Sequence, residues 1–358
     1  MHCRGLARTV VTIAAGLAVV TPVAARPGAA AAAGGNLAHR FVTVMTRNLD
    51  EGTDFGYVIA AANGQIAFST AVALTYGEVL ASNVCGRAAT MADEIAAAKP
   101  DLVSIQEAAV WTGPVAAGCA GAATPTTIDA GAALLQRLAD DGAGYVVVKQ
   151  QDEFSSSAIA SLLPPGLSFL DRDLLLARVE DPDLLSVANV TAAHFSTLLP
   201  LPLAPGITIV ITRGWISADA TLRGRTVRVI ATHLESFYEP VQEAQGQELV
   251  LGPANTTLPV IIAGDLNTGP GSALTATYGL LTTTAGFTDS WTVTHPGDPG
   301  YTDAFYTEDP LTPAVPSERI DLVLARGNLV PSKDVQVGGE IPHPSDHAGV
   351  VATIRMPS

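Results

Sequence analysis

Aromatic and basic residues are scarce in this chain of 358 residues. Aromatic side chains make up 5% of it, so the core must be built from the Ala, Val, Leu and Ile that dominate its 48% of hydrophobic residues. Lys and Arg number 19 against 34 Asp and Glu, and the formal net charge is −15. Such an acidic surface argues against non-specific binding of duplex nucleic acid, which needs clustered cations. It does not exclude nucleic acid as a transient substrate held through a metal.

Several sequence patterns are also missing. There is no internal repeat and no linker that would divide the chain. No Cys/His spacing supports a structural zinc site. No G-x-S-x-G motif surrounds Ser345, so this serine is expected to cap a turn rather than to act as a nucleophile.

The first 25 residues have the features of an export signal. Arg4 and Arg8 give a basic start, residues 10–20 an apolar middle, and residues 23–25 a small-residue cleavage site. The apolar run is too short to span a bilayer comfortably, which disfavours a membrane anchor. We therefore expect a secreted protein with a signal peptide at 1–25, a flexible Ala/Gly-rich lead-in at 26–38 and a single domain at 39–358.

Cysteine usage fits this expectation. Cys3 would be lost with the signal peptide, which leaves Cys85 and Cys119. An even pair in an oxidising compartment favours a disulfide. Two unpaired structural thiols are the alternative, because a sequence does not measure the distance between them.

Hydrophobic periodicity predicts a mixed α/β fold. Some strands follow one another as hairpins and others are separated by helices, which favours two sheets packed face to face with helices outside, within one domain. Residues 152–169 and 331–344 are expected to be loops. The main predicted strands are 41–46, 101–105, 174–179, 226–232, 259–263, 319–325 and 348–355, and the main helices are 87–98, 129–140 and 242–251.

The stretch LPVIIAGDLNTGPG, residues 258–271, is the centre of the functional hypothesis. Gly264 is expected to end a buried strand, and alternation in an extended chain would place Asp265 and Asn267 on one face. A carboxylate and an amide there could hold a metal ion, a phosphate or an attacking water. Taken alone, the same residues could form an ordinary turn.

Similar polar residues follow other apolar runs. Glu107 and Asp346 could bind a hard cation such as Mg²⁺, which prefers carboxylates, waters and phosphate oxygens. His347 beside Asp321 would form an acid/base pair, because a nearby carboxylate raises the pKa of an imidazole and fixes its tautomer. His233 could donate to a phosphate oxygen. Together these groups suit metal-assisted attack of water on a phosphoester.

Seven short motifs occur in a fixed order across residues 47–347: RNL (47–49), QE (106–107), THLE (232–235), GDLN (264–267), DSW (289–291), RIDLVL (319–324) and SDH (345–347). Each motif is weak alone. As an ordered set they resemble the endonuclease/exonuclease/phosphatase superfamily, which includes deoxyribonuclease I, abasic-site endonucleases, neutral sphingomyelinases and inositol polyphosphate 5-phosphatases. The resemblance implies a four-layer α/β sandwich, with two packed mixed β-sheets flanked by helices, and a divalent-metal-dependent phosphoesterase.

The resemblance also implies roles for single residues. Asp171 is placed to support His233, and Asp289 and Trp291 are expected to be structural. The identity of the general base stays open. The implied catalytic residues are His233, Asp265, Asn267, Asp321 and His347, and the implied ligands of Mg²⁺ or Mn²⁺ are Asn48, Glu107 and Asp346.

Each of these residues has a purely structural alternative. Asn48 could cap a turn, and Glu107 could be a surface acid. His233 could be a core histidine bonded to backbone. Asp321 could form a plain salt bridge with Arg319 or Arg326.

The substrate is less determined than the chemistry. An endonuclease-type activity on nucleic acid is favoured, with local contacts available from basic residues. A sphingomyelinase-like phospholipase C would need an exposed apolar or aromatic hairpin to contact the membrane, for which 161–169 is a candidate. A small-molecule phosphatase and a catalytically inactive binding module are further alternatives. No stable protein partner is implied, and a monomer is expected. The available basic residues are Arg47, Arg87, Arg172, Arg178 and Arg213.

Overall fold

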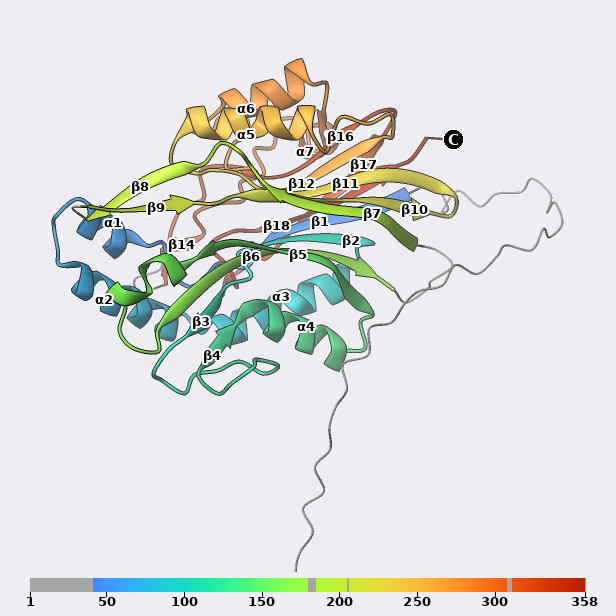
Figure 1. The fold of residues 1–358 in the computed structure, drawn as a ribbon. Helices are drawn as coiled ribbons and strands as arrows, with labels where there is room; N and C mark the ends of the chain where they lie inside the picture. The colour runs from blue at the N-terminus through green and yellow to red at the C-terminus, as the bar shows by residue number, and fades with distance from the viewer. Residues whose placement is uncertain (1–40, 180–184, 205, 308–310, 358) are drawn as a thin grey trace, which may run out of the picture. The chain divides into compact units, whose positions relative to one another are not determined.

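The computed structural model describes residues 41–179, 185–204, 206–307 and 311–357. The predicted signal peptide and lead-in lie outside these residues, so the division into leader and domain stays a prediction. The described part is built around two large mixed sheets that pack face to face, with helices on their outer faces (Figure 1). None of the described helices is long and apolar enough to cross a bilayer. The predicted four-layer α/β sandwich is confirmed.

The first sheet has eight strands in the order β17-β18-β1-β2-β6-β3-β4, with β5 also paired to β6. β1 and β2 are parallel, and β18 runs antiparallel to β1. The strands are β1 (Phe41–Asn48), β2 (Leu102–Gln106), β3 (Val110–Thr112), β4 (Thr127–Asp129), β5 (Tyr145–Ser155), β6 (Ser168–Arg178), β17 (Val330–Val337) and β18 (Gly349–Arg355).

The second sheet has six strands in the order β13-β16-β12-β11-β10-β7. β11 and β12 are parallel, and β16 runs antiparallel to β12. Two further pairs, β8–β9 and β14–β15, stand apart from both large sheets. The strands are β7 (Leu185–His194), β8 (Leu199–Ala204), β9 (Ile207–Ile211), β10 (Gly214–Leu222), β11 (Arg225–His233), β12 (Val260–Asp265), β13 (Thr288–Asp289), β14 (Tyr306–Thr307), β15 (Thr312–Pro313) and β16 (Asp321–Arg326).

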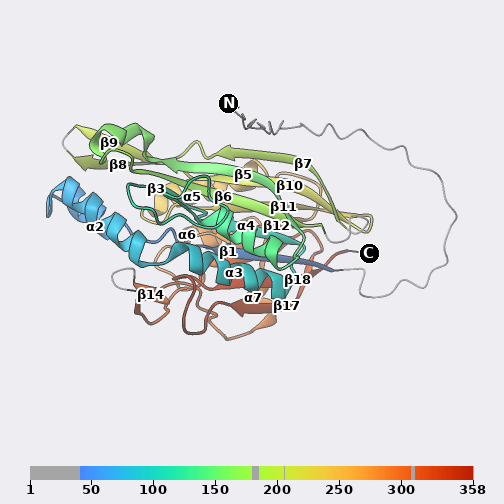
Figure 2. The same cartoon turned by 90° about the horizontal axis from the view of Figure 1, so that it is seen from below.

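The helices cover the outer faces of the two sheets. In Figures 1 and 2, α3 and α4 lie against the first sheet, and α5 and α6 lie against the second. The helices are α1 (Gly56–Ala62), α2 (Phe68–Ala81), α3 (Val84–Ala98), α4 (Ala130–Asp140), α5 (Glu239–Leu251), α6 (Ala276–Gly279) and α7 (Ser290–Thr294), with short helical turns η2 (Ser156–Leu162) and η3 (Leu280–Thr284).

Alternation along the central strands builds three apolar layers. On β6, Leu175 packs between the sheets, whereas Leu174 and Leu176 pack against the helices of the first sheet. On β12, Ile261 packs between the sheets and Ile262 against the helices of the second. Successive side chains of a strand point to opposite faces, so a strand buried on both faces is apolar throughout. This explains why the Leu and Ile runs do not alternate with polar residues.

Two loop predictions are wrong. Residues 331–344 contain most of β17, whose exposed edge-strand side chains hid the strand pattern. Residues 152–169 contain the end of β5, the turn η2 and the start of β6. Leu167 and Phe169 are buried there. Polar and Pro-Gly residues made that segment resemble a surface loop, but tertiary contacts override local propensity.

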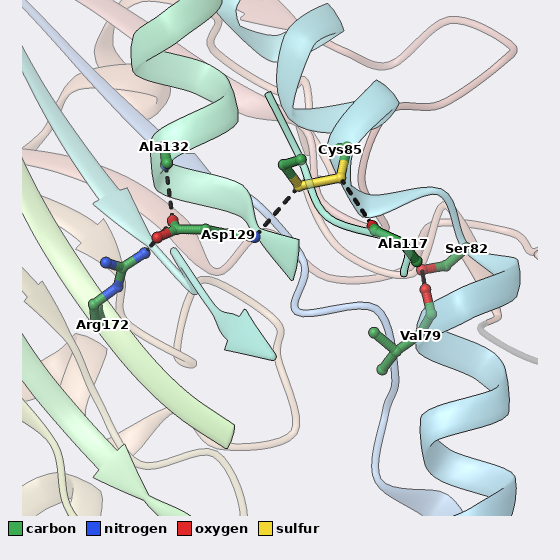
Figure 3. Close-up of a disulfide and its surroundings, with 8 residues drawn as sticks. Val79, Ser82, Cys85, Ala117, Asp129, Ala132 and Arg172 are labelled. Atoms are coloured by element: carbon green, nitrogen blue, oxygen red, sulfur yellow. Dashed lines mark hydrogen bonds and ion pairs between the residues drawn. A yellow bond between two sulfur atoms is a disulfide. The ribbon is translucent and has the colours of Figure 1, made fainter. Parts of the chain in front are cut away.

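The predicted disulfide between Cys85 and Cys119 is present, and it joins α3 to the loop between β3 and β4 (Figure 3). Asp129, which caps α4 through the amide of Ala132 at 2.8 Å, donates its own amide to the sulfur of Cys119. Arg172 pairs with Asp129 and also donates to the carbonyl oxygen of Ala108 at 2.8 Å. The disulfide is therefore connected, through a short chain of contacts, to the residue beside Glu107.

Replacing both Cys85 and Cys119 with Ala should lower the free energy of unfolding by about 3–4 kcal/mol, because a crosslink between residues 34 apart restricts the unfolded chain. Urea denaturation of the two proteins measures the difference. Thiol labelling of the denatured, unreduced mature protein, which lacks Cys3, should modify neither Cys85 nor Cys119. Labelling of both would refute the disulfide.

Candidate active site

The topology brings several strand ends to one edge of the sandwich. β1 and β2 are parallel, so their carboxyl ends lie together, and the same holds for β11 and β12. β18 and β16 run antiparallel to these pairs and therefore begin at the same edge. Ser104 on β2 donates to the carbonyl oxygen of Ala263 on β12 at 2.8 Å, which ties the two sheets together beside this edge.

Cross-strand register aligns the residues of the second sheet. His233 ends β11 opposite Asp265, which ends β12, and Asp265 lies opposite Asp321, which begins β16. The first sheet supplies Asn48 at the end of β1, Glu107 after β2, and Asp346 and His347 before β18. The structure therefore brings the eight predicted site residues to one place, although their roles stay predictions.

Asn48 links the acids of the two sheets. Its Nδ2 donates to Glu107 Oε1 at 2.9 Å and to Asp265 Oδ2 at 3.2 Å, while its Oδ1 accepts from the amide of Asp50 at 2.8 Å. The amide nitrogen thus bridges the two carboxylates, and the amide oxygen is turned towards the backbone. Glu107 has a φ of 56°, which turns the chain sharply after β2 and directs this carboxylate into the site rather than onto the surface.

His347 and Asp321 form a buried pair. The distance from His347 Nδ1 to Asp321 Oδ2 is 2.8 Å, and Nε2 faces Asp303 Oδ1 at 3.5 Å and Asp265 Oδ2 at 3.9 Å. Burial alone would lower the pKa of His347, but the carboxylates of Asp321, Asp346 and Asp265 outweigh it and hold the pKa well above the usual value. The imidazolium is therefore the favoured form of His347.

Asp321 is also fixed by its backbone, because Thr302 Oγ1 accepts from the amides of Ile320 and Asp321, both at 3.1 Å. Asp321 does not form the salt bridge with Arg319 that was the structural alternative for this residue. Instead, Arg319 makes two hydrogen bonds to Asp289, at 3.0 and 2.8 Å. Asp289 also caps α7, which agrees with its predicted structural role.

His233 has a different environment, which the sequence did not reveal. Arg213 Nη1 lies 3.1 Å from His233 Nδ1 and 3.2 Å from Asp171 Oδ2. Because arginine carries only donors, Nδ1 must accept, and the proton of His233 sits on Nε2, 3.6 Å from Asp265 Oδ2. Burial, then the charges of Arg213 and His347, lower the pKa of His233 well below its usual value. Asp171 is thus linked to His233 indirectly, because Arg213 forms a hydrogen bond with each of them.

Asn267 reaches the site by a turn rather than by an extended chain. β12 runs through Gly264 to Asp265, and a Cβ on Gly264 would lie 1.9 Å from the carbonyl oxygen of Thr232 on β11. The glycine is therefore required by strand packing and does not end the strand. Asn267 has a φ of 49°, its amide donates to Asp265 Oδ1 at 2.9 Å, and its Nδ2 donates to the carbonyl oxygen of Leu234 at 3.0 Å.

Ser345 anchors the last motif. Its hydroxyl donates to the carbonyl oxygen of Asn48 at 3.0 Å and accepts from the amide of His347 at 3.1 Å. Arg47 donates to the carbonyl oxygen of His347 at 2.6 Å. Both residues are fully buried and fix the loop before β18 against β1. The predicted turn-capping role of Ser345 is consistent with these contacts.

Negative charge is concentrated in the site. Burial, followed by repulsion from Asp321, raises the pKa of Asp265 to about 7. Burial is also the main cause that raises the pKa of Glu107 and of Asp346. Like charges held together in a poorly solvated place favour protonation or a cation. These carboxylates therefore suit a hard divalent cation, which takes oxygen ligands.

Two groups of side chains have potential ligand atoms within 4.8 Å of one another: Glu107, His233 and Asp265, and Asp265, Asp321 and His347. In the protonation states described above neither histidine has a free nitrogen, so the carboxylates are the candidate ligands. Asp346 lines the same cavity but belongs to neither group. The donor chemistry fits a metal site, and Asp265, for which the resemblance implied a catalytic role, belongs to both groups.

Of the five arginines expected to contact nucleic acid, Arg213 lines the site cavity and the other four do not. All five form ion pairs with carboxylates of the protein, so a polyanion would have to compete with these carboxylates. The pairs are Arg47 with Glu94, Arg87 with Asp50, Arg172 with Asp129, Arg178 with Asp101, and Arg213 with Asp171.

Comparison with known families identifies the class of protein to which this chain belongs. The profile of the Endonuclease/Exonuclease/phosphatase family matches residues 80–347. The chain belongs to this family. Members of the endonuclease/exonuclease/phosphatase family are metal-dependent hydrolases of phosphoester bonds, and the protein is such an enzyme. A sequence comparison with curated proteins finds no match.

Solved structures of the endonuclease/exonuclease/phosphatase family share the fold. The Bacteroides vulgatus endonuclease/exonuclease/phosphatase is 14% identical with a TM-score of 0.54, and the alignment covers 88% of this chain and 99% of that one. The Beutenbergia cavernae protein of the same description is 21% identical with a TM-score of 0.53, covering 89% and 72%. The human Nocturnin catalytic domain with bound sulfate anion is 17% identical with a TM-score of 0.53, covering 89% and 94%.

We expect Mg²⁺ or Mn²⁺ to raise the melting temperature of the wild-type protein, since a cation bound only by the folded state stabilises it by about 2.7 kcal/mol at a hundredfold excess over Kd. Glu107→Gln should lose most of this metal-induced shift while melting no lower in EDTA, because it removes one of the repelling buried carboxylates. Differential scanning calorimetry measures both. Asp140→Asn on the surface of α4 is the control and should keep the full shift; an unchanged shift in Glu107→Gln would contradict the metal site.

Proposed function

We propose that the protein hydrolyses phosphodiester bonds with Mg²⁺ or Mn²⁺ as cofactor. The observation that carries the proposal is one cavity lined jointly by Glu107, His233, Asp265, Asn267 and His347. A protonated histidine, a neutral histidine and a set of carboxylates converge there. These are the groups that a phosphodiester and an attacking water require.

The proposed cation ligands are Glu107 and Asp346, with Asn48 and Asp265 beside them. When bound, the cation would neutralise negative charge on the phosphate oxygens. Asn48 holds Glu107 and Asp265 in place through its amide nitrogen. The remaining steps are assigned to side chains of the chain itself.

Asp265 and Asn267 orient the water that attacks phosphorus. The rigid turn between them, closed by the hydrogen bond from the Asn267 amide to Asp265, sets their relative position. As the water oxygen bonds to phosphorus, the opposite ester bond breaks. The water loses one proton and the departing alkoxide gains one, so the products are a phosphomonoester and an alcohol. The acceptor of the water proton is not assigned.

The two histidines stabilise the charge that develops. His347, held as imidazolium by Asp321, directs Nε2 into the cavity and can donate a hydrogen bond or a proton to an oxygen on phosphorus. His233 donates through Nε2 as a neutral imidazole, because Arg213 occupies its Nδ1 side. The pair provides one charged and one neutral donor for the same phosphate.

Nucleic acid is the phosphodiester expected from the sequence, and a phosphodiester with an apolar alcohol is the second candidate. The ion-paired arginines weaken support for nucleic acid, and the apolar part of the cavity favours the second candidate. Export from the cell is supported by the leader-like first 25 residues and by the disulfide, which is typical of oxidising compartments. A monomer is proposed for the mature protein.

Hydrolysis of bis-(p-nitrophenyl) phosphate should depend on Mg²⁺ or Mn²⁺, stop in EDTA, and fall about a hundredfold or more in His347→Ala, because that variant loses the acid that faces the cavity. Asp265→Ala should lose hydrolytic activity to the same extent. Release of p-nitrophenolate measures the rate, and circular dichroism checks the fold. His295→Ala, outside the site, is the matched control. A folded and fully active Asp265→Ala enzyme would refute the assignment.

A plasmid assay tests the nucleic-acid candidate separately. If nucleic acid is the substrate, purified mature protein in Mg²⁺ or Mn²⁺ should convert supercoiled plasmid to the nicked form, and both EDTA and His347→Ala should abolish nicking. Agarose gels read the result. Because the arginines near the site are paired with acids, we expect nicking to be weak compared with hydrolysis of the nitrophenyl ester. Efficient nicking at physiological salt would overturn this expectation.

A further inference from the structure

The cavity that contains the polar site is much larger than the site itself. It has a volume of about 300 Å³ and is lined in large part by apolar side chains. This volume lies at the lower end of the range, roughly 300–1,000 Å³, that is typical of small-molecule sites. Protein interiors are close-packed, with few voids larger than a water molecule. An open apolar chamber next to a catalytic centre therefore suggests a binding site for an apolar group of the substrate.

Segments far apart in the chain build this apolar chamber. α1 and α2 supply one wall, β3, β6 and the turn η2 a second, and the β8–β9 hairpin a third; in Figure 1 the hairpin lies above α1 and α2. The hairpin belongs to neither large sheet. The apolar side chains that line the chamber include Ile59, Trp111, Phe169, Leu203, Ile209 and Ile211.

The scarce aromatic residues are concentrated here. Five of the nine phenylalanines line the cavity. The rings of Trp111 and Phe169 pack with centroids 4.3 Å apart, and Phe55 meets Phe169 at 5.4 Å. Phe237, four residues after His233, lines the cavity while remaining 60% exposed. An apolar surface thus extends from the packed interior to an exposed ring near the catalytic histidine.

The polar and apolar parts belong to one continuous cavity. Glu107, His233, Asp265 and His347 line it together with the apolar side chains. A phosphodiester bound at the polar part must therefore place one of its ester groups against the apolar part. The apolar side chains of the walls offer no hydrogen bonds to the edges of a nucleobase, and few hydroxyl groups lie among them. Buried polar groups without partners are costly.

We propose that the chamber binds an apolar chain carried by one alcohol of the substrate, so that the enzyme prefers amphiphilic phosphodiesters to nucleic acid. This inference rests on the proposed phosphodiesterase function and names its substrate class. The stretch 161–169 was expected as an exposed hairpin for a membrane, but Leu167 and Phe169 are buried and, with Leu163, line the chamber wall.

The test uses p-nitrophenyl alkyl phosphates with methyl, butyl and octyl groups, which share one leaving group and one reaction. Burial of each further methylene should raise kcat/KM by about threefold to fourfold until the chamber is filled. The p-nitrophenyl ester of thymidine phosphate serves as the nucleic-acid arm and should be hydrolysed less efficiently than the octyl ester.

A matched pair of variants places the effect in the chamber. Ile211→Gln puts a polar side chain into the apolar wall and should flatten the dependence of kcat/KM on chain length. Val210→Gln is the control, since Val210 neighbours Ile211 on β9, is 45% exposed and does not line the cavity. If Ile211→Gln does not fold, a second pair of variants replaces it. Leu163, which follows η2, lines the cavity, and Leu163→Gln is the test. Leu162, the last residue of η2, is 37% exposed and does not line the cavity, so Leu162→Gln is its control.

The outcomes separate the two proposals. Metal-dependent hydrolysis that rises with chain length, and loses that rise in Ile211→Gln but not in Val210→Gln, supports the inference. Equal hydrolysis of all alkyl esters, or a preference for the thymidine ester, overturns it and leaves the phosphodiesterase function standing. No hydrolysis of any ester in the presence of metal defeats the phosphodiesterase function itself.

Discussion

Buried negative charge is the constraint on which the site depends. Glu107, Asp265, Asp321 and Asp346 come from both sheets and lie within one poorly solvated region, where burial raises the pKa of Glu107, Asp265 and Asp346. Such groups repel one another, and the apolar layers of the sandwich must supply the free energy that holds them together. Their repulsion is relieved by His347, by the amide of Asn48 and, in the proposed mechanism, by a divalent cation.

The two histidines show how position in the fold decides chemistry. Both end or precede a central strand, and both face Asp265. His347 is bonded to a carboxylate, which favours the imidazolium, whereas His233 is bonded to Arg213, which favours the neutral ring. One residue type therefore provides two different donors. Arg213, which precedes β10 of the second sheet, in turn balances Asp171 on β6 of the first, so the counter-charge spans the two sheets.

The described structure also connects the catalytic edge to the proposed substrate preference. The same cavity continues from the charged groups into a chamber walled by α1, α2 and the β8–β9 hairpin. These elements lie outside the two large sheets, whereas the remaining wall includes Trp111 on β3 and Phe169 on β6 of the first sheet. In the proposed function the sheets fix the reacting groups, and the chamber selects what the phosphate carries. Changes in the elements outside the sheets could then alter specificity without disturbing the chemistry.

The sequence by itself determined the fold class, the family and the residues that meet at the sheet edge, because ordered motifs and buried strand patterns are local properties. It favoured the disulfide but left two unpaired thiols as the alternative. It could not determine that Asn267 turns in a left-handed conformation, that Gly264 lies inside β12, or that Arg213 stands between Asp171 and His233. The sequence also suggested that five arginines were available to bind a ligand, whereas in the structure each forms an ion pair with a carboxylate of the protein. These features depend on which side chains become neighbours in space, and only the tertiary structure decides that. The apolar chamber belongs to the same class, since its walls come from segments separated by more than 100 residues in the chain.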